Sequence, residues 1–217
     1  MTTSSSSLRD NVFINCPFDK AYKPIFNALV FAIHDAGFVA RCSLEVVDSG
    51  PTRLATIISI IAECTYGIHD ISRTETGGKT KLPRFNMPFE CGLFWGCLKY
   101  GEEKHKGKRI LVLDSEPYRY QESISDISGQ DIKAHNNDPR IAIDKVRSWL
   151  NAGSNRKTIP GGKAIWDHYV LFQSELTPIL KTAGITRGEL DTPEYYPDYV
   201  TFIVDWLKAR EAKAAKK

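Results

Sequence analysis

Two carboxylic acids stand where a protein could use them for chemistry. Asp70 lies near the end of the apolar segment 66–71, and Glu90 follows Pro88 at the start of a predicted helix. A carboxylate can attack or stabilise an electron-poor carbon, and a protonated carboxyl can donate a proton to a leaving group. Because a helix N-terminus favours negative charge, we expect Glu90 to be ionised at neutral pH, whereas Asp70 would need a raised pKa to act as an acid.

Residues that could bind a sugar or a phosphate lie near these acids in the sequence. They occupy the loops 15–20 and 70–73, the position just before the second loop, and the segment that leads into the helix of Glu90. The candidate substrate-binding residues are Asn15, Pro17, Phe18, Asp19, His69, Arg73, Asn86 and Met87. Free backbone N–H groups at the start of the helix would add a place for an anion.

Each candidate also has a structural interpretation. Glu90 could be only a capping group in a first helical turn, Asp70 only a loop cap, and His69 a satisfied histidine at a strand end. Four arginines could hold a phosphate or pair with surface acids: Arg41, Arg53, Arg73 and Arg84.

The segments that would position these residues alternate between strands and helices. Strands are predicted at 12–15, 38–41, 66–71 and 109–114, and helices at 22–36, 52–64 and 88–100. This alternation predicts an α/β fold with a flavodoxin-like (Rossmann-like) parallel sheet and a helical C-terminal extension. With the strand order 2-1-3-4, the loops after the first and third strands meet where such sheets bind ligands.

The pattern changes after Asp114. The segment 115–137 is polar and rich in turn residues, and its part 118–131 could be a lid over the crevice or an ordered surface loop. Helices are predicted at 139–150, 163–182 and 195–212. We divide the chain into a disordered N-terminus 1–10, an α/β core 11–115, a mainly helical extension 116–207 packed on the core and a basic tail 208–217.

Large aromatic side chains predict how the extension is held. They are Trp149, Trp166, Phe172 and Trp206. Such side chains are too large to leave exposed on a monomer, so we expect them to be buried within the chain or in an interface with a second subunit or a partner protein.

Composition excludes several classes of protein. The chain is 42% apolar and 25% charged, as is usual for a globular domain. Its formal charge of +3 comes from the segment 208–217, which holds five Lys or Arg against one Glu, so a solvated helix end explains it better than nucleic-acid binding. Neither a secretory signal nor a long apolar run is visible, and we expect a cytoplasmic protein that does not enter a membrane.

The cysteines form no CxxC pair, so buried free thiols are expected rather than disulfides or a zinc site. They are Cys16, Cys42, Cys64, Cys91 and Cys97. His135 and His168 are isolated in the sequence, and we predict neither a metal nor a cofactor.

Three short motifs resemble the nucleoside 2-deoxyribosyltransferase family. The segment 12–18 resembles its opening strand and loop, 68–71 its strand-three aspartate, and 89–93 the Phe-Glu-Leu-Gly turn that bears its nucleophilic glutamate. The resemblance covers about 12–114. It departs from the family at 84–88, where the family usually has an Asp and a Gly.

The resemblance implies an N-glycosidase on a flavodoxin-like sheet, with Glu90 as nucleophile and Asp70 as acid. This family and the related TIR domains cleave N-glycosidic bonds of nucleosides, nucleotides or NAD, and members of the group act in bacterial anti-phage defence. We therefore expect hydrolysis, rather than transfer, of NAD or a deoxynucleotide, by a homo-oligomer or with a partner protein. The alternatives are a catalytically silent nucleotide sensor that signals through the extension, and a TIR-like interaction module whose crevice is filled by side chains.

Overall fold

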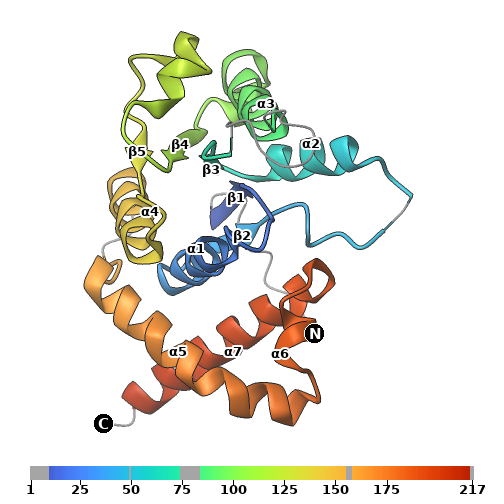
Figure 1. Ribbon diagram of the computed structural model, residues 1–217, viewed down its shortest axis with the longest axis vertical. Helices are drawn as coiled ribbons and strands as arrows, with labels where there is room; N and C mark the ends of the chain where they lie inside the picture. Colours follow the sequence, from blue (N-terminus) through green and yellow to red (C-terminus); the bar gives the residue numbers. More distant parts are fainter. Residues whose placement is uncertain (1–9, 49, 74–83, 155–157, 216–217) are drawn as a thin grey trace.

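The computed structural model describes residues 10–48, 50–73, 84–154 and 158–215, and it has a five-stranded parallel sheet in the order β2-β1-β3-β4-β5 (Figure 1). The strands are β1 (Asn11–Asn15), β2 (Val39–Arg41), β3 (Tyr66–Asp70), β4 (Arg109–Asp114) and β5 (Lys133–Ala134). The predicted α/β class and the order of the first four strands are thereby confirmed. Nearly all of the predicted disordered N-terminus 1–10 lies outside the described residues, as does the whole polar segment 74–81 that stands between the third predicted strand and the helix of Glu90 in the sequence.

Helices cover both faces of the sheet. They are α1 (Lys23–Asp35), α2 (Arg53–Glu63), α3 (Asn86–Tyr100) and α4 (Pro139–Gly153). Helices α1 and α4 lie side by side on one face, and α2 and α3 on the other (Figure 1). Local signals start two of them: the Thr52 side chain accepts a hydrogen bond from the backbone N–H of Ala55 at α2, and Asp138 accepts from that of Arg140 at α4.

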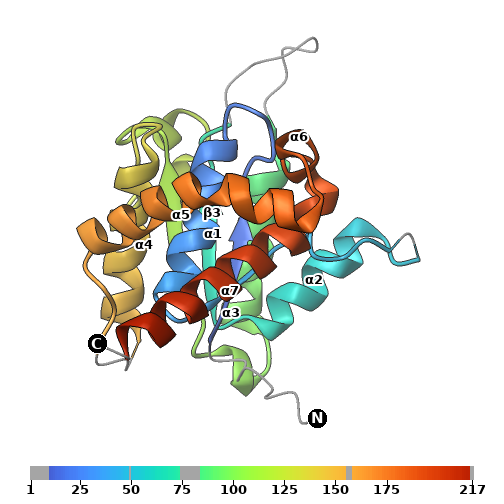
Figure 2. The same cartoon turned by 90° about the horizontal axis from the view of Figure 1, so that it is seen from below.

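The C-terminal helices form a further layer against α1. They are α5 (Gly162–Ala183), α6 (Arg187–Leu190) and α7 (Tyr196–Ala214). Figure 2 shows α5 and α7 crossing over α1. Every residue from Ile25 to Ile33 is buried, because α1 lies between the sheet on one side and this layer on the other.

The predicted aromatic anchors pack within the chain. The ring of Phe31 on α1 lies 5.4 Å from that of Phe172 and 5.9 Å from that of Trp206, centre to centre. Trp149 and Trp166 are half-buried against the same core. We expected these side chains to be buried either within the chain or in an interface, and the structure shows them packed within the chain.

Two elements differ from the sequence expectation. The strand β5 was not predicted, because it consists of two residues in a polar segment and is paired only with the end of β4. Helix α3 begins at Asn86 rather than Pro88, so Glu90 lies in its second turn. Among the described residues, no helix is both long and apolar enough to cross a membrane.

Candidate functional site

A crevice of about 220 Å³ lies at the carboxyl end of β1, beside the first turn of α3. Its lining residues are Cys16, Pro17, Phe18, Asp19, Arg53, Arg84, Asn86 and Met87. Five of the predicted substrate-binding residues are therefore brought together here, from the loop after β1 and the start of α3. This is the side of a parallel sheet where strand order reverses and ligands usually bind.

Glu90 is not among the residues that line this crevice, but it stands on the same face of α3 as two residues that are. It follows Asn86 by four residues and Met87 by three, and residues at these spacings share a helix face. Its side chain is turned inward, with 8% of the residue exposed, and no described residue forms a hydrogen bond with its carboxyl group. The carboxyl group of this buried residue can therefore still form hydrogen bonds with a ligand.

Burial decides the protonation of Glu90. Loss of water raises its pKa to about 7, and the positive charge of Arg53 only partly opposes this. Glu90 was expected to be ionised at neutral pH, but with this pKa it is only partly ionised there. The helix dipole acts most strongly on groups in the first turn. Because α3 begins at Asn86, Glu90 lies beyond that turn and gains little from the dipole.

Asp70 lies at the end of β3 and is completely enclosed. Its Oδ2 accepts a 2.6 Å hydrogen bond from the Tyr22 hydroxyl, and its Oδ1 accepts a 2.9 Å bond from the backbone N–H of Ser72. His135 Nε2 lies 2.9 Å from Oδ2 as a close polar contact. With no exposed surface, Asp70 does not reach the crevice, so the geometry gives no support to its predicted role as a proton donor to a substrate.

The tautomer of His135 follows from its second nitrogen. Nδ1 accepts a 3.0 Å hydrogen bond from the backbone N–H of Asn137, which leaves the ring proton of the neutral form on Nε2. Nε2 lies close to Asp70 Oδ2 but outside hydrogen-bond geometry. Asn136 and Asn137 both have positive φ angles, and this turn brings the ring back toward β3. Sequence reasoning missed His135 and Tyr22 as partners of Asp70, because no local pattern links positions so far apart.

Asn15 and His69 brace α3 instead of lining the crevice. The Asn15 side-chain amide donates to the backbone carbonyl of Met87 at 2.7 Å, and its Nδ2 lies 3.1 Å from His69 Nδ1. Burial lowers the pKa of His69 to about 3, so the ring is neutral. These two predicted substrate-binding residues are both buried. Their contacts hold the first turn of α3 against β1 and β3.

Asp19 forms ion pairs with two arginines near the crevice. Its Oδ2 lies 3.4 Å from Arg73 Nε and 3.7 Å from Arg84 Nη1, while its Oδ1 accepts from the backbone N–H of Tyr22 at 3.0 Å. Arg41 is instead bound to Glu45 and Glu63, as in the alternative interpretation. The arginines with a place at the mouth of the crevice are thus Arg53 and Arg84, and both line it.

Cys16 lies within electrostatic reach of the surrounding acids. Its thiol is buried, and both this burial and the negative charges of Asp70, Glu90 and Asp19 raise its pKa well above the ordinary value. A thiol in these surroundings stays protonated, so it is a poor nucleophile. Cys16 is therefore not a candidate for attack on an electron-poor carbon.

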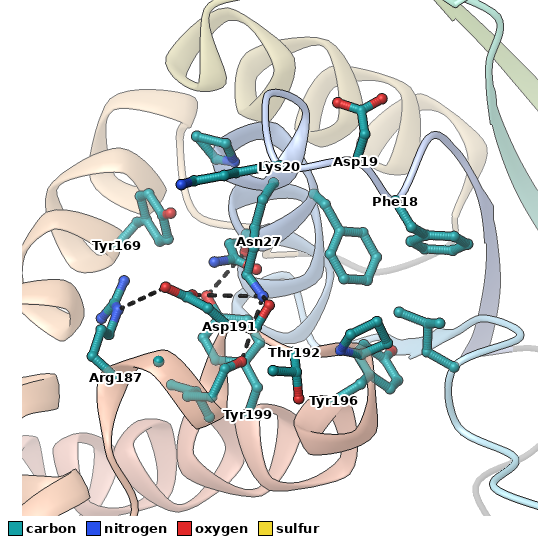
Figure 3. Close-up of a pocket in the computed structure, with 17 residues that line it drawn as sticks. Phe18, Asp19, Lys20, Asn27, Tyr169, Arg187, Asp191, Thr192, Tyr196 and Tyr199 are labelled. Carbon is teal, nitrogen blue, oxygen red and sulfur yellow. Dashed lines mark hydrogen bonds and ion pairs between the residues drawn. The ribbon is translucent and has the colours of Figure 1, made fainter. Parts of the chain in front are cut away.

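A larger cavity, of about 630 Å³, adjoins the crevice across Phe18 and Asp19. It lies between the N-terminal part of α1 and the helices α5, α6 and α7 (Figure 3). Its lining includes Lys20, Lys23, Phe26, Asn27, Tyr169, Arg187, Asp191, Tyr196 and Tyr199. No pattern in the sequence predicted this cavity, because its walls come from segments separated by more than a hundred residues.

In the described part of the chain, no group of three or more His, Cys, Asp or Glu could hold a metal ion. Comparisons of the chain with models of protein families, with curated proteins and with solved structures gave no significant match.

Proposed function

We propose that this protein hydrolyses the N-glycosidic bond of a nucleotide, with a pyridinium nucleotide such as NAD as the preferred substrate. The observation that carries the proposal is the buried carboxyl group of Glu90, which has no hydrogen-bond partner among the described residues and shares a helix face with two crevice-lining residues, Asn86 and Met87. The resemblance of the segment 89–93 to a glutamate-bearing turn supports the same role.

Glu90 would act on the sugar carbon C1′. When the C1′–N bond breaks, its electron pair stays with the base nitrogen and positive charge develops on the sugar. The Glu90 carboxylate would stabilise this charge or bond to C1′, and a water molecule would then add its oxygen to C1′ and release a proton. About half of the molecules at pH 7 would carry the ionised form that this step needs.

The enclosure of Asp70 favours a particular leaving group. A purine base leaves more readily when an acid protonates it, and Asp70 is not exposed to a substrate. Nicotinamide in NAD carries a positive charge on the bonded nitrogen, so it leaves as a neutral molecule without any proton donor. We therefore place NAD ahead of deoxynucleotides. Depletion of NAD would also fit the predicted role in anti-phage defence.

The test is release of free base from NAD and from deoxynucleotides, followed by liquid chromatography, with wild-type protein, Glu90→Gln and the control Glu116→Gln. Glu116 is exposed and lies outside the crevice. We expect nicotinamide release by the wild type and the control, and a loss of at least about 100-fold in Glu90→Gln. Equal activity of all three proteins would refute the role of Glu90.

The second candidate function is a nucleotide sensor without catalysis. It is favoured by the volume of the crevice, about 220 Å³, which is small for a whole dinucleotide. A sensor would bind NAD in calorimetry without releasing nicotinamide, and Glu90→Gln would bind it equally well. A pure interaction module, with its crevice filled by side chains, would bind no nucleotide in the same experiment.

A further inference from the structure

The cavity between α1 and the C-terminal helices has features of a built ligand site. Its volume of about 630 Å³ lies in the range of pockets that hold small molecules. Aromatic rings form much of its wall: those of Phe26 and Tyr196 lie 5.7 Å apart, and Tyr169 faces the hollow from α5 (Figure 3). Such walls suit a flat ring, because aromatic groups gain energy from stacked or edge-on contact.

Asn27 supplies a polar group inside this apolar hollow. It lies in the second turn of α1 and is 8% exposed, and its neighbours Phe26 and Ala28 are apolar and buried. Only its backbone carbonyl has a further partner, the Tyr199 hydroxyl at 3.3 Å, and no described residue hydrogen-bonds its side-chain amide. Asn27 is one of the residues that line the cavity.

An asparagine in this position is costly for folding. It is a poorer helix former than an apolar straight-chain residue, and its side chain is largely withdrawn from bulk water without a hydrogen-bond partner among the described residues. A ligand that offers both a donor and an acceptor, as the edge of a nucleobase does, would satisfy the amide oxygen and nitrogen together.

Charge at the rim indicates an anion. Lys20, Lys23 and Arg187 line the cavity, against the two acids Asp19 and Asp191. Lys23 and Arg187 share Asp191, at 3.5 and 3.9 Å. The other acid, Asp19, lies close to two further arginines near the crevice.

Lys20 differs from the other two cations of the cavity, because it has no acidic partner among the described residues. It is exposed and forms no ion pair with any described residue, and it lies along the upper edge of the hollow in Figure 3. An ammonium group at this edge is free to bind a phosphate.

We propose that this cavity binds a nucleoside 5′-monophosphate, with the base between the aromatic walls, its edge on the Asn27 amide and its phosphate at Lys20. The proposal does not depend on the activity assigned to Glu90, because Glu90 does not line this cavity. It adds a second nucleotide site, next to the crevice and separated from it by Phe18 and Asp19.

The test is isothermal titration calorimetry of the full chain with AMP, GMP, CMP and UMP, and with adenosine and inorganic phosphate as partial probes. The variants are Lys20→Ala, Asn27→Leu and Glu90→Gln, and the control is Lys99→Ala, which changes an exposed lysine outside the cavity. Circular dichroism and thermal melting show whether Asn27→Leu folds. Lys20→Ala changes an exposed side chain and decides the question even if Asn27→Leu does not fold.

We expect one of the four monophosphates to bind at one site per chain. Lys20→Ala should weaken it about fivefold and Asn27→Leu at least about tenfold, while Glu90→Gln and Lys99→Ala leave it unchanged. Adenosine, which lacks the phosphate, should not respond to Lys20→Ala. The proposal is overturned if none of the four monophosphates binds, if inorganic phosphate binds as tightly as they do, or if Lys20→Ala leaves their affinity unchanged.

Discussion

His135 Nε2 lies 2.9 Å from Asp70 Oδ2, and neither side chain has any exposed surface. The Tyr22 hydroxyl donates to the same oxygen at 2.6 Å. Three segments that are far apart in the sequence therefore meet at one carboxylate: the loop before α1, the end of β3 and the turn after β5. A buried polar cluster of this kind stabilises one arrangement of the loops, because each member would be costly to leave without its partners.

This cluster predicts that Asp70 acts on stability. We expect Asp70→Asn to lower the free energy of unfolding by about 2 kcal/mol, and Tyr22→Phe by about 1 kcal/mol, in urea titrations. The matched control is Asp131→Asn, an exposed acid paired with Lys133, which should change the stability by less than about 0.5 kcal/mol. An Asp70→Asn protein with wild-type stability and a reduced kcat would instead restore Asp70 as a proton donor.

The pH dependence of base release should report Glu90. With its pKa raised to about 7, the carboxyl group is mostly protonated at pH 6 and mostly ionised at pH 8. If the ionised form acts on C1′, kcat should rise with pH, with a midpoint near pH 7, and level off above pH 8. A rate that stays constant from pH 5 to pH 8 would show that another group, or an already ionised Glu90, limits the reaction.

Stability should depend on pH through the same group. A carboxyl with a pKa of 4.5 in the unfolded chain and about 7 in the fold binds its proton more tightly when folded, so its ionisation destabilises the fold as the pH rises from 4.5 through 7. Glu90→Gln removes this cost. We expect the variant to match wild type at pH 5 and to be more stable by about 2–3 kcal/mol at pH 8. If Glu90→Gln and wild type had equal unfolding free energies at pH 5 and also at pH 8, the pKa of Glu90 would not be raised in the fold.

The sequence was a good guide to the sheet and a poorer one to the site. Alternation of apolar runs with helical periodicity is a local property, and it predicted four strands and a parallel sheet, whereas the order 2-1-3-4 came with the flavodoxin-like fold class. The partners of Asp70 are not local: Tyr22 and His135 reach it only through the packing of α1 and β5. The pKa of Glu90 also depends on burial, which the sequence does not show directly. A strand of two residues such as β5 leaves no periodic signal at all.

The aromatic contact between α1 and α7 makes a strong prediction about the C-terminal layer. Trp206 packs on Phe31 and Phe172, and its Nε1 donates a 2.6 Å hydrogen bond to Glu175. Trp206→Ala should therefore lower the unfolding free energy by about 3–5 kcal/mol. Tyr100→Ala is the control, since that ring is 92% exposed and should matter little. If Trp206→Ala and Tyr100→Ala lowered the unfolding free energy by similar amounts, Trp206 in the aromatic cluster would contribute no more to stability than an exposed ring.

Two truncations separate this layer from the tail. Deleting the chain from Asn137 onward removes α4, α5 and α7 and uncovers α1, whose residues Ile25–Ile33 are all buried, so we expect aggregation. Deleting 208–217 removes the end of α7, where Arg210 lies 5.6 Å over the Trp206 ring, a contact worth about 0.5–1 kcal/mol. The shorter chain should therefore stay folded and melt only a few degrees lower. Size-exclusion chromatography and thermal melting measure both outcomes. A soluble, sharply melting product of the larger deletion would show that the sheet folds with α1, α2 and α3 alone, and that α4 and the C-terminal layer form a separate module.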